Sequence, residues 1–274
     1  MRLLALLLLL TASCGKQDET PSANSDAKAE APVAPAAPKA PPAAPPPSAK
    51  AFKVEEKTEL YTFSFAWPAE AAAIPGLAER FKAEMAKAKA ELKRDASRDL
   101  DERKEGGFPF HAYELQRAYE TAGQSDRLLS LESSVYSFTG GAHGSTGSGS
   151  LIWDRQSGKE TSIPDLLSAS QSWTGAITQA FCILLNRERE KRRGAPVEPG
   201  STFGDCPKYG ELTKVLRDTN GNGRFDHVGV IADQYVAGPY AEGPYEIALP
   251  ITAKMIERLK PEYATSFEPK PPVK

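Results

Sequence analysis

The sequence predicts an α+β protein in which antiparallel meander sheets pack with two or three helices. Several short runs alternate apolar with polar residues, which is the pattern of half-buried strands. Two longer segments repeat apolar residues at helical spacing. The part of the chain beyond residue 50 is also long enough to bury a hydrophobic core.

The first predicted strand covers residues 57–67. Its odd positions from Tyr61 to Trp67 are all aromatic, so one side of the strand is a core face. Pro68 cannot continue the ladder and ends the strand. An amphipathic helix is predicted from Pro75 to about Arg103. Its apolar positions recur at helical spacing and are Leu77, Phe81, Met85, Ala88 and Leu92.

A glycine pair at residues 106 and 107 ends this helix, and a meander of strands follows. Residues 108–119 and 127–138 predict two antiparallel strands joined near residues 122–125, and residues 151–155 continue the sheet. Between the last two runs lies a glycine-dense turn that carries His143. Its glycines tolerate positive φ, so the chain can reverse tightly there.

A second helix is predicted to open at residues 170–173 and to end in the basic run 187–193, which suits the negative end of a helix dipole. Its core stripe consists of Trp173, Ile177, Ala180, Phe181 and Leu184. The last strands are predicted at residues 226–234 and 245–250. Thr252 then caps a short terminal helix.

The first 13 residues predict a lipoprotein signal peptide. One positive charge precedes an apolar run that is too short to span a bilayer, and small residues lead to Cys14. We expect Cys14 to be acylated and to become the mature N-terminus; an ordinary secretory signal with a free cysteine is the alternative. Residues 14–51 form the lipidated N-terminus and a Pro/Ala-rich linker, which favours extended polyproline II over a packed core.

Three motifs resemble one family. The run Tyr-Ser-Phe-Thr-Gly-Gly-Ala-His at residues 136–143, the run Ile-Trp-Asp at residues 152–154 and the block at residues 235–250 resemble the domain of unknown function 3298. The layout of residues 52–130 is similar to its usual companion, the domain of unknown function 4163. The resemblance implies one α+β subdomain at residues 52–130 and a second at residues 131–268, followed by the tail 269–274.

Members of this family are bacterial envelope proteins. They include the ectodomain of a lysozyme-sensing anti-sigma factor and the accessory part of a peptidoglycan deacetylase. The resemblance therefore implies an envelope location, and Gly15 after the lipid cysteine fits an outer-membrane anchor with the folded part facing the periplasm. It also implies a lysozyme-type protein or peptidoglycan as the partner, besides the membrane itself.

A disulfide follows from the cysteine count. The chain has three cysteines. With Cys14 assigned to lipid, Cys182 and Cys206 form the remaining pair in a chain expected to reach an oxidising compartment. Their bridge would pin the segment between Gly194 and Gly204 to the second helix and contribute on the order of 3 kcal/mol.

Residues 218–226 predict a calcium site. Oxygen ligands at positions one, three, five and nine, a carbonyl at seven and glycine at six match most of an EF-hand-like loop. The ligands would be Asp218, Asn220, Asn222, the carbonyl of Arg224, and Asp226. Gly229 stands where a glutamate is expected, so Asp205, Asp233 or a water would complete the sphere. The alternative is a turn stabilised by Asx side chains without metal.

A binding surface is predicted around the Gly-Pro repeats of residues 235–245. Three tyrosines in that run supply contact area at low entropic cost, and we expect them to meet the His143 turn. The candidate ligand-binding residues are His143, Tyr235, Tyr240, Glu242 and Tyr245. The alternative is that these tyrosines only cover the sheet.

The composition and motifs argue against several functions. The net charge is -2, without the basic footprint of a nucleic-acid binder. None of the three histidines has another three to five residues away, which argues against a zinc hydrolase. No Gly-x-Ser-x-Gly elbow supports a serine hydrolase that would pair His143 with Asp154. No phosphate-binding loop is present either.

We therefore expect a non-catalytic binding module on the envelope, for a lysozyme-type muramidase or for peptidoglycan. No catalytic residue is assigned, and no cofactor is expected beyond the calcium ion. The runner-up is a cell-wall glycan hydrolase that uses His143 and nearby carboxylates, because a pair of catalytic acids cannot be recognised from sequence alone.

Overall fold

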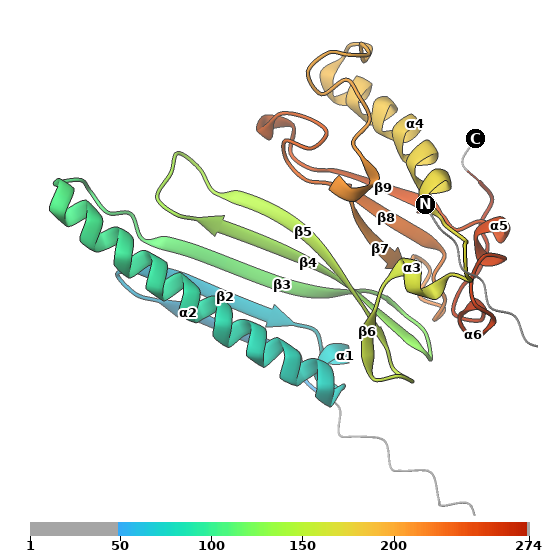
Figure 1. Cartoon of the computed structure of the whole chain (residues 1–274), viewed down its shortest axis with the longest axis horizontal. Coiled ribbons are helices and arrows are strands. Elements are labelled where there is room, and N and C mark those ends of the chain that lie inside the picture. Colours follow the sequence, from blue (N-terminus) through green and yellow to red (C-terminus); the bar gives the residue numbers. More distant parts are fainter. Residues whose placement is uncertain (1–48, 273–274) are drawn as a thin grey trace, which may run out of the picture. The chain divides into compact units, whose positions relative to one another are not determined.

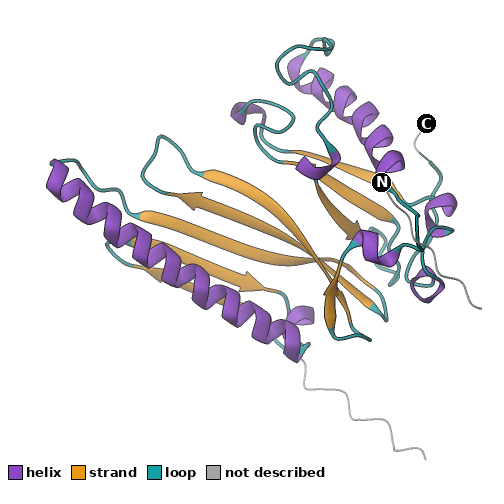
Figure 2. Cartoon of the chain, viewed as in Figure 1, coloured by secondary structure: helices purple, strands orange, loops and turns teal. Residues whose placement is uncertain are grey.

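The computed structural model describes residues 49–272. The predicted signal peptide, Cys14 and nearly all of the linker lie outside these residues. All described residues belong to one compact unit, Pro45–Lys274. It combines a six-stranded sheet, a three-stranded sheet and several helices (Figure 2), which confirms the α+β prediction. Within the described part, no helix is both long and apolar enough to cross a membrane.

The six-stranded sheet contains the first six strands in sequence order. They are β1 (Phe52–Lys57), β2 (Tyr61–Trp67), β3 (Tyr113–Gln124), β4 (Leu128–Phe138), β5 (Ser145–Asp154) and β6 (Lys159–Thr161). All neighbours are antiparallel except β2 and β3, which are parallel. The expected pure meander is wrong at this pair, because the long connection through a helix lets the chain re-enter the sheet in the same direction.

Two differences from the expected strands have local causes. The predicted strand 57–67 contains the last residue of β1, a turn and the whole of β2. The chain turns there because the Thr58 side chain accepts the backbone N–H groups of Leu60 and Tyr61. β3 starts later than predicted but continues through the predicted turn. A bulge between Thr121 and Gly123 keeps it paired with β4 to Gln124.

Helix α2 (Pro75–Gly106) runs along one face of β2 and β3, after the short α1 (Ala69–Ala72) (Figure 1). Gly107 ends it in the left-handed conformation, at φ 70°. We call the sheet face toward α2 the helix face and the opposite one the open face. The helix face carries the aromatic residues of β2, which are buried as predicted.

The three-stranded sheet consists of β7 (Thr213–Arg217), β8 (His227–Ala232) and β9 (Tyr245–Pro250), all antiparallel. Helix α4 (Thr174–Arg193) contacts β9. Short helices complete this part, namely α3 (Ile163–Leu166), α5 (Ala253–Ile256), α6 (Pro261–Ala264), η1 (Tyr209–Glu211) and η2 (Tyr240–Glu242). The Thr252 side chain accepts the N–H of Met255, which confirms the predicted cap.

β4 and β5 contribute side chains to both hydrophobic cores. Leu128 and Ile152 belong to the core under the three-stranded sheet, whereas their neighbours Leu129 and Trp153 belong to the core under α2. Successive strand residues point to opposite faces, so these strand ends are buried on both sides. The division expected between residues 130 and 131 falls inside β4 and stays a prediction.

The predicted disulfide is present. Cys182 in α4 is bonded to Cys206, with their Cα atoms 5.6 Å apart. The bridge attaches the loop that follows α4 to the helix itself. Arg189, one turn before the helix end, holds the same loop, because its guanidinium donates to the carbonyls of Gly204 and Asp205 at 3.2 and 3.1 Å.

We expect replacement of Cys182 and Cys206 by alanine to lower the free energy of unfolding by about 3 kcal/mol, because the unfolded chain regains the freedom of the closed loop. Urea unfolding of the wild type and the double variant measures this. Reductant should lower the wild-type midpoint and leave that of the variant unchanged. A wild-type midpoint insensitive to reductant would contradict the prediction.

Asp154 is the last residue of β5, and its carboxylate is buried, with 2% of the residue exposed. It accepts hydrogen bonds from Arg127 at 3.2 Å, from Tyr263 at 3.2 Å and from the backbone N–H of Gln156 at 2.9 Å. Burial alone would raise the pKa of Asp154, but the hydrogen bonds from Arg127 and the backbone outweigh it and hold that pKa below its usual value.

A carboxyl whose pKa is lowered by folding stabilises the protein above its unfolded pKa of about 3.9 and loses that stabilisation as the pH falls. We therefore expect Asp154→Asn to lower the unfolding free energy by roughly 1–3 kcal/mol at pH 7, and the gap to narrow below about pH 4. Urea unfolding at several pH values measures it. Asp126→Asn, at an exposed carboxyl in the β3–β4 turn, is the control. A gap that stays constant down to pH 3 would refute the role of the charge.

Candidate functional site

The largest candidate site is a groove of about 510 Å³ on the open face of the six-stranded sheet. Two rows of directly paired residues cross five strands there. One row is Glu55, Ser64, Gln116, Tyr136 and Thr146, and the other is Lys53, Ala66, Ala118, Ser134 and Ser148. Each row is roughly 19 Å long, because neighbouring strands lie ~4.8 Å apart.

Apart from Lys53 at its outer end, the second row consists of alanine and serine, whose short side chains hollow the sheet surface beside the first row. Period-two alternation dictates this composition, since the same strands use their other positions for the helix-face core. The charged side chains of the groove are partnered. Lys53 pairs with Glu55 at 2.7 Å, and Asp233 is bonded to Ser148. Arg117 also contributes to the lining, but its guanidinium pairs with Glu84 of α2 on the helix face.

The loop between β8 and β9 walls one end of the groove. Asp233 accepts the backbone N–H of Ser148 at 3.0 Å and its hydroxyl at 2.7 Å. Gln234 accepts the hydroxyl of Thr146. The wall is therefore attached to β5 by side-chain bonds, although the two segments lie far apart in the sequence.

A stack of rings lies where this loop meets the β4–β5 turn. The His143 ring is 4.3 Å from that of Tyr240, and the Tyr240 ring is 5.8 Å from that of Tyr235. The Tyr240 hydroxyl donates to the carbonyl of Gly144 at 3.2 Å. The structure thus brings together three of the five predicted binding residues, from the two segments that the sequence had singled out.

Glycine is required twice in the β4–β5 turn. Gly140 has φ 85°, which a side chain rarely adopts. Gly144 has ordinary φ, but a Cβ there would collide with the Tyr136 ring. Close packing therefore explains Gly144, and positive φ was the wrong expectation for it. Gly144 therefore lies between Tyr136, which lines the groove, and Tyr240, whose hydroxyl bonds its carbonyl.

Tyr235 is the most exposed member of the stack. Its side chain is 56% exposed although its backbone has φ 69°, which is unfavourable for a residue with a bulky side chain. A turn bond from its N–H to the carbonyl of Gly238, at 3.0 Å, fixes this conformation. Strain that presents a large aromatic ring to solvent favours a binding role.

Glu242 and Tyr245 lie behind the surface. Tyr245 is fully buried, donates to Glu242 and lies under the Arg192 guanidinium. Arg193 donates to both Glu242 oxygens at 2.9 and 3.0 Å, which lowers the pKa of Glu242. These two predicted residues therefore support the loop and do not line the groove.

The basic end of α4 organises this loop. Arg189 is fully buried and donates from Nε to the carbonyl of Ala237 at 2.9 Å. Arg192 donates to the carbonyls of Glu242 and Pro244 at 2.8 and 2.9 Å. The basic run 187–193 predicts only a favourable helix terminus. The signal for more was the spacing of Arg189 on the buried stripe, two turns after Phe181.

His143 and Asp154 do not form a catalytic pair. His143 lies two residues before β5, and Asp154 is the last residue of this strand of 10 residues. The two ends of β5 are about 30 Å apart at ~3.3 Å per residue. The Nδ1 atom of His143 contacts the carbonyl of Gly144 at 2.9 Å. No carboxylate contact of His143 is recorded among the described residues.

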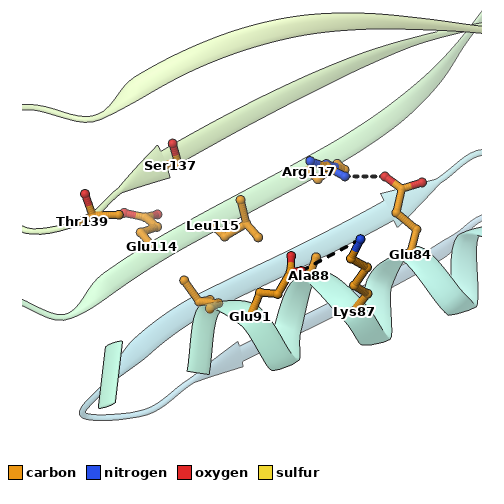
Figure 3. Close-up of a pocket in the computed structure, with 10 residues that line it drawn as sticks. Glu84, Lys87, Ala88, Glu91, Glu114, Leu115, Arg117, Ser137 and Thr139 are labelled. Atoms are coloured by element: carbon orange, nitrogen blue, oxygen red, sulfur yellow. Dashed lines mark hydrogen bonds and ion pairs between the residues drawn. The ribbon is translucent and has the colours of Figure 1, made fainter. Parts of the chain in front are cut away.

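A second hollow, of about 280 Å³, lies on the helix face between α2 and the far ends of β3 and β4 (Figure 3). Glu84 there accepts from Arg117 and from the Tyr119 hydroxyl at 2.7 Å. Burial and then this hydrogen bond raise the pKa of Tyr119 to about 12. Because Glu84 is held by these partners, the arrangement favours a structural role over an acid catalyst.

The predicted calcium residues lie in the loop between β7 and β8. Asp218 accepts the backbone N–H groups of Gly221 and Gly223, each at 2.8 Å. Asp205 and Asp233 have other partners, the N–H of Gly200 and Ser148. Glu268, which the sequence interpretation missed, contacts this loop instead. No local motif could have indicated it, because it lies more than 40 residues away.

Comparisons with known proteins agree with the sequence motifs. Residues 54–146 match the family model described as deacetylase PdaC. No curated protein matches the chain. A solved structure of a DUF3298 family member from Bacteroides fragilis NCTC 9343 is 15% identical, with a TM-score of 0.47, over 77% of this chain and 92% of that one.

A solved structure of a DUF3298 family protein from Pseudomonas aeruginosa PAO1 is 18% identical, with a TM-score of 0.48, over 81% of this chain and 98% of that one. The companion domain 4163 stays a prediction. The chain is thus similar to proteins of the domain of unknown function 3298, with residues 54–146 matching the deacetylase PdaC family model.

Proposed function

We propose that this chain is a lipid-anchored envelope protein whose groove binds the glycan strands of peptidoglycan without cleaving them. The groove on the open face carries this proposal. It extends across five strands, and the aromatic rings of the β8–β9 loop lie next to Gln234 at one end of its lining. A linear polymer fits such a shape better than a compact small molecule does.

The chemistry of the groove favours a hydroxyl-rich and nearly neutral ligand. Gln116, Ser134 and Thr146 offer amide and hydroxyl groups that both donate and accept hydrogen bonds. The ring stack offers flat aromatic faces, against which the C–H faces of sugar rings pack. The charged side chains of the groove are already partnered, Lys53 with Glu55 and Asp233 with Ser148, which gives no reason to expect a polyanion or a polycation.

The family-model match supports a ligand from the cell wall. The matched family is named for a deacetylase. The matched residues run from within β1 to the start of β5 and include all of β2, β3 and β4, which supply most of both rows. The sequence motifs resemble those of bacterial envelope proteins. A protein in the envelope would have access to peptidoglycan. A muramidase remains the alternative partner, and a glycan hydrolase the alternative activity.

The anchor has its own test. If Cys14 is acylated, the mature protein should carry labelled fatty acid and fractionate with membranes, and Cys14→Ala should abolish both. Radiolabelled palmitate and membrane fractionation measure this. Labelling that survives in the variant would refute the anchor at Cys14 and leave the groove proposal untouched.

Binding is tested with two matched substitutions of exposed serines. Ser134→Arg fills the groove, whereas Ser145→Arg places the same side chain on the opposite face. We expect the purified protein to sediment with isolated peptidoglycan sacculi, Ser134→Arg to bind at least ~tenfold more weakly, and Ser145→Arg to bind like the wild type. Tenfold corresponds to about 1.4 kcal/mol.

Each alternative predicts a different result. Equal binding by both arginine variants would place the site outside the groove. Failure to bind sacculi, with retention of lysozyme by the wild type but not by Ser134→Arg, would identify a muramidase as the partner. Release of soluble dye from labelled sacculi, lost in His143→Ala, would show the hydrolase.

A further inference from the structure

We propose that the outer edge of β1 pairs with the same edge of a second copy of this chain, so that two six-stranded sheets join into one continuous sheet. β1 is the last strand at one side of its sheet. Pairing through the same edge of each copy is an isologous contact, which closes after two chains. The inference does not rest on the proposed function, because it needs no ligand.

The hydrogen bonds of the β1–β2 hairpin show which backbone groups of β1 face outward. The N–H of Thr58 donates to the carbonyl of Tyr61 at 2.8 Å, so these two residues form a hydrogen-bonded pair. Such pairs alternate along an antiparallel ladder, and the register between β1 and β2 is unbroken. Residues of β1 with even numbers therefore bond to β2, whereas the N–H and C=O groups of Lys53, Glu55 and Lys57 point away from it.

This edge is open within the part of the chain that the structure describes. No hydrogen bond from another described segment reaches the backbone of residues 53, 55 or 57. Helix α2, which covers the sheet, contacts β2 and β3. The side chains of Lys53 and Glu55 are 64% and 66% exposed. Each outward-facing residue thus offers one backbone donor and one acceptor to a further strand.

The charge pattern of β1 selects one register for that strand. In an antiparallel pair, opposite residues share a face, and those of a hydrogen-bonded pair direct their backbone groups at each other. Placing Lys53 opposite Glu55 of the second copy meets both conditions and, by symmetry, repeats the same pair on the other side of the axis. Each pair exchanges two backbone hydrogen bonds and sets opposite charges side by side.

The neighbouring registers bring like charges together, which destabilises a sheet. Moving the two-fold axis from Val54 to residue 53 would set Lys53 against its own equivalent. Moving it to residue 55 would set Glu55 against Glu55 and Lys53 against Lys57. Charged residues commonly keep strand edges apart, but the order Lys, Val, Glu is complementary to itself. The ion pair between Lys53 and Glu55 is exposed, so exchanging its partners costs little.

The helix face gains apolar contacts in the same register. Val54 lies on the two-fold axis and meets its equivalent in the second copy. It is half-buried at the margin of the core under α2, as is Phe52, whose ring lies 3.9 Å from that of Trp67. A further strand would remove more of this margin from water and would add a cross-strand contact between two β-branched side chains.

The contact would also lengthen the groove. Lys53 and Glu55 begin the two rows of the open face, so each row of one copy would continue into the other row of the second copy. The joined rows would be roughly 43 Å long at ~4.8 Å between strands. The dimer would therefore present twice the hydroxyl-lined surface to an extended ligand.

The test is oxidative crosslinking of the purified full-length protein with Cys14→Ala, so that an introduced thiol is the only free one. Val54→Cys places one thiol of each copy on the axis, where opposite β-carbons lie about 4.5–5.5 Å apart. Copper phenanthroline with O2 removes two electrons and two protons from the two thiols, which form one disulfide. We expect a product with the mass of two chains, measured by non-reducing electrophoresis and mass spectrometry.

Lys57→Cys is the matched control on the same strand. In the proposed register the two residues 57 lie six positions apart, about 20 Å at ~3.3 Å per residue, so the yield should be at least ~tenfold lower. Equal yields from both cysteine variants would indicate random collision and overturn the contact, as would the absence of a crosslinked product from Val54→Cys.

Charge reversal tests the register. Lys53→Glu, added to Val54→Cys, sets two acidic side chains opposite each other and should lower the yield several-fold. Adding Glu55→Lys as well restores opposite charges and should restore the yield. Both positions are exposed, so neither reversal is expected to unfold the chain. A yield unchanged by the single reversal, or one that does not recover in the double reversal, contradicts the pairing.

Discussion

The structure depends on the alternation of side chains in β4 and β5. Where these strands end, both faces are buried, because one set of residues enters the core under α2 and the adjacent set enters the core under the three-stranded sheet. A shift of either strand by one residue would exchange the two sets. One register therefore fixes both cores, and with them the position of the second sheet on the open face of the first.

The groove is a by-product of the same constraint. Beyond Glu132, which binds Arg217 of β7, the second sheet no longer covers the open face. The next open-face positions along β4, Ser134 and Tyr136, are polar and reach solvent. Their neighbours on the helix face stay close to α2. The groove thus begins where the cover ends, and the β8–β9 loop borders it there.

Much of this could be read from the sequence, because it is local. The aromatic side of β2, the long helix, the β3–β4 hairpin and the cysteine pair follow from periodicity and counting. The meeting of His143 with Tyr240 was also expected. What escaped prediction needs contacts between distant segments. Three features leave no local pattern: the parallel entry of β3, the burial of Arg189 under the β8–β9 loop, and the approach of Glu268 to the β7–β8 loop.

The attachment of Asp233 to Ser148 has one more consequence. β6 pairs only with the last residues of β5, which leaves residues 145–151 at an edge of the sheet. Asp233 occupies the N–H of Ser148, and the Thr213 hydroxyl donates to its carbonyl at 3.1 Å. Unpaired strand edges template edge-to-edge aggregation. The loop that borders the groove therefore also blocks strand addition, so that two copies of the chain are kept from pairing through residues 145–151.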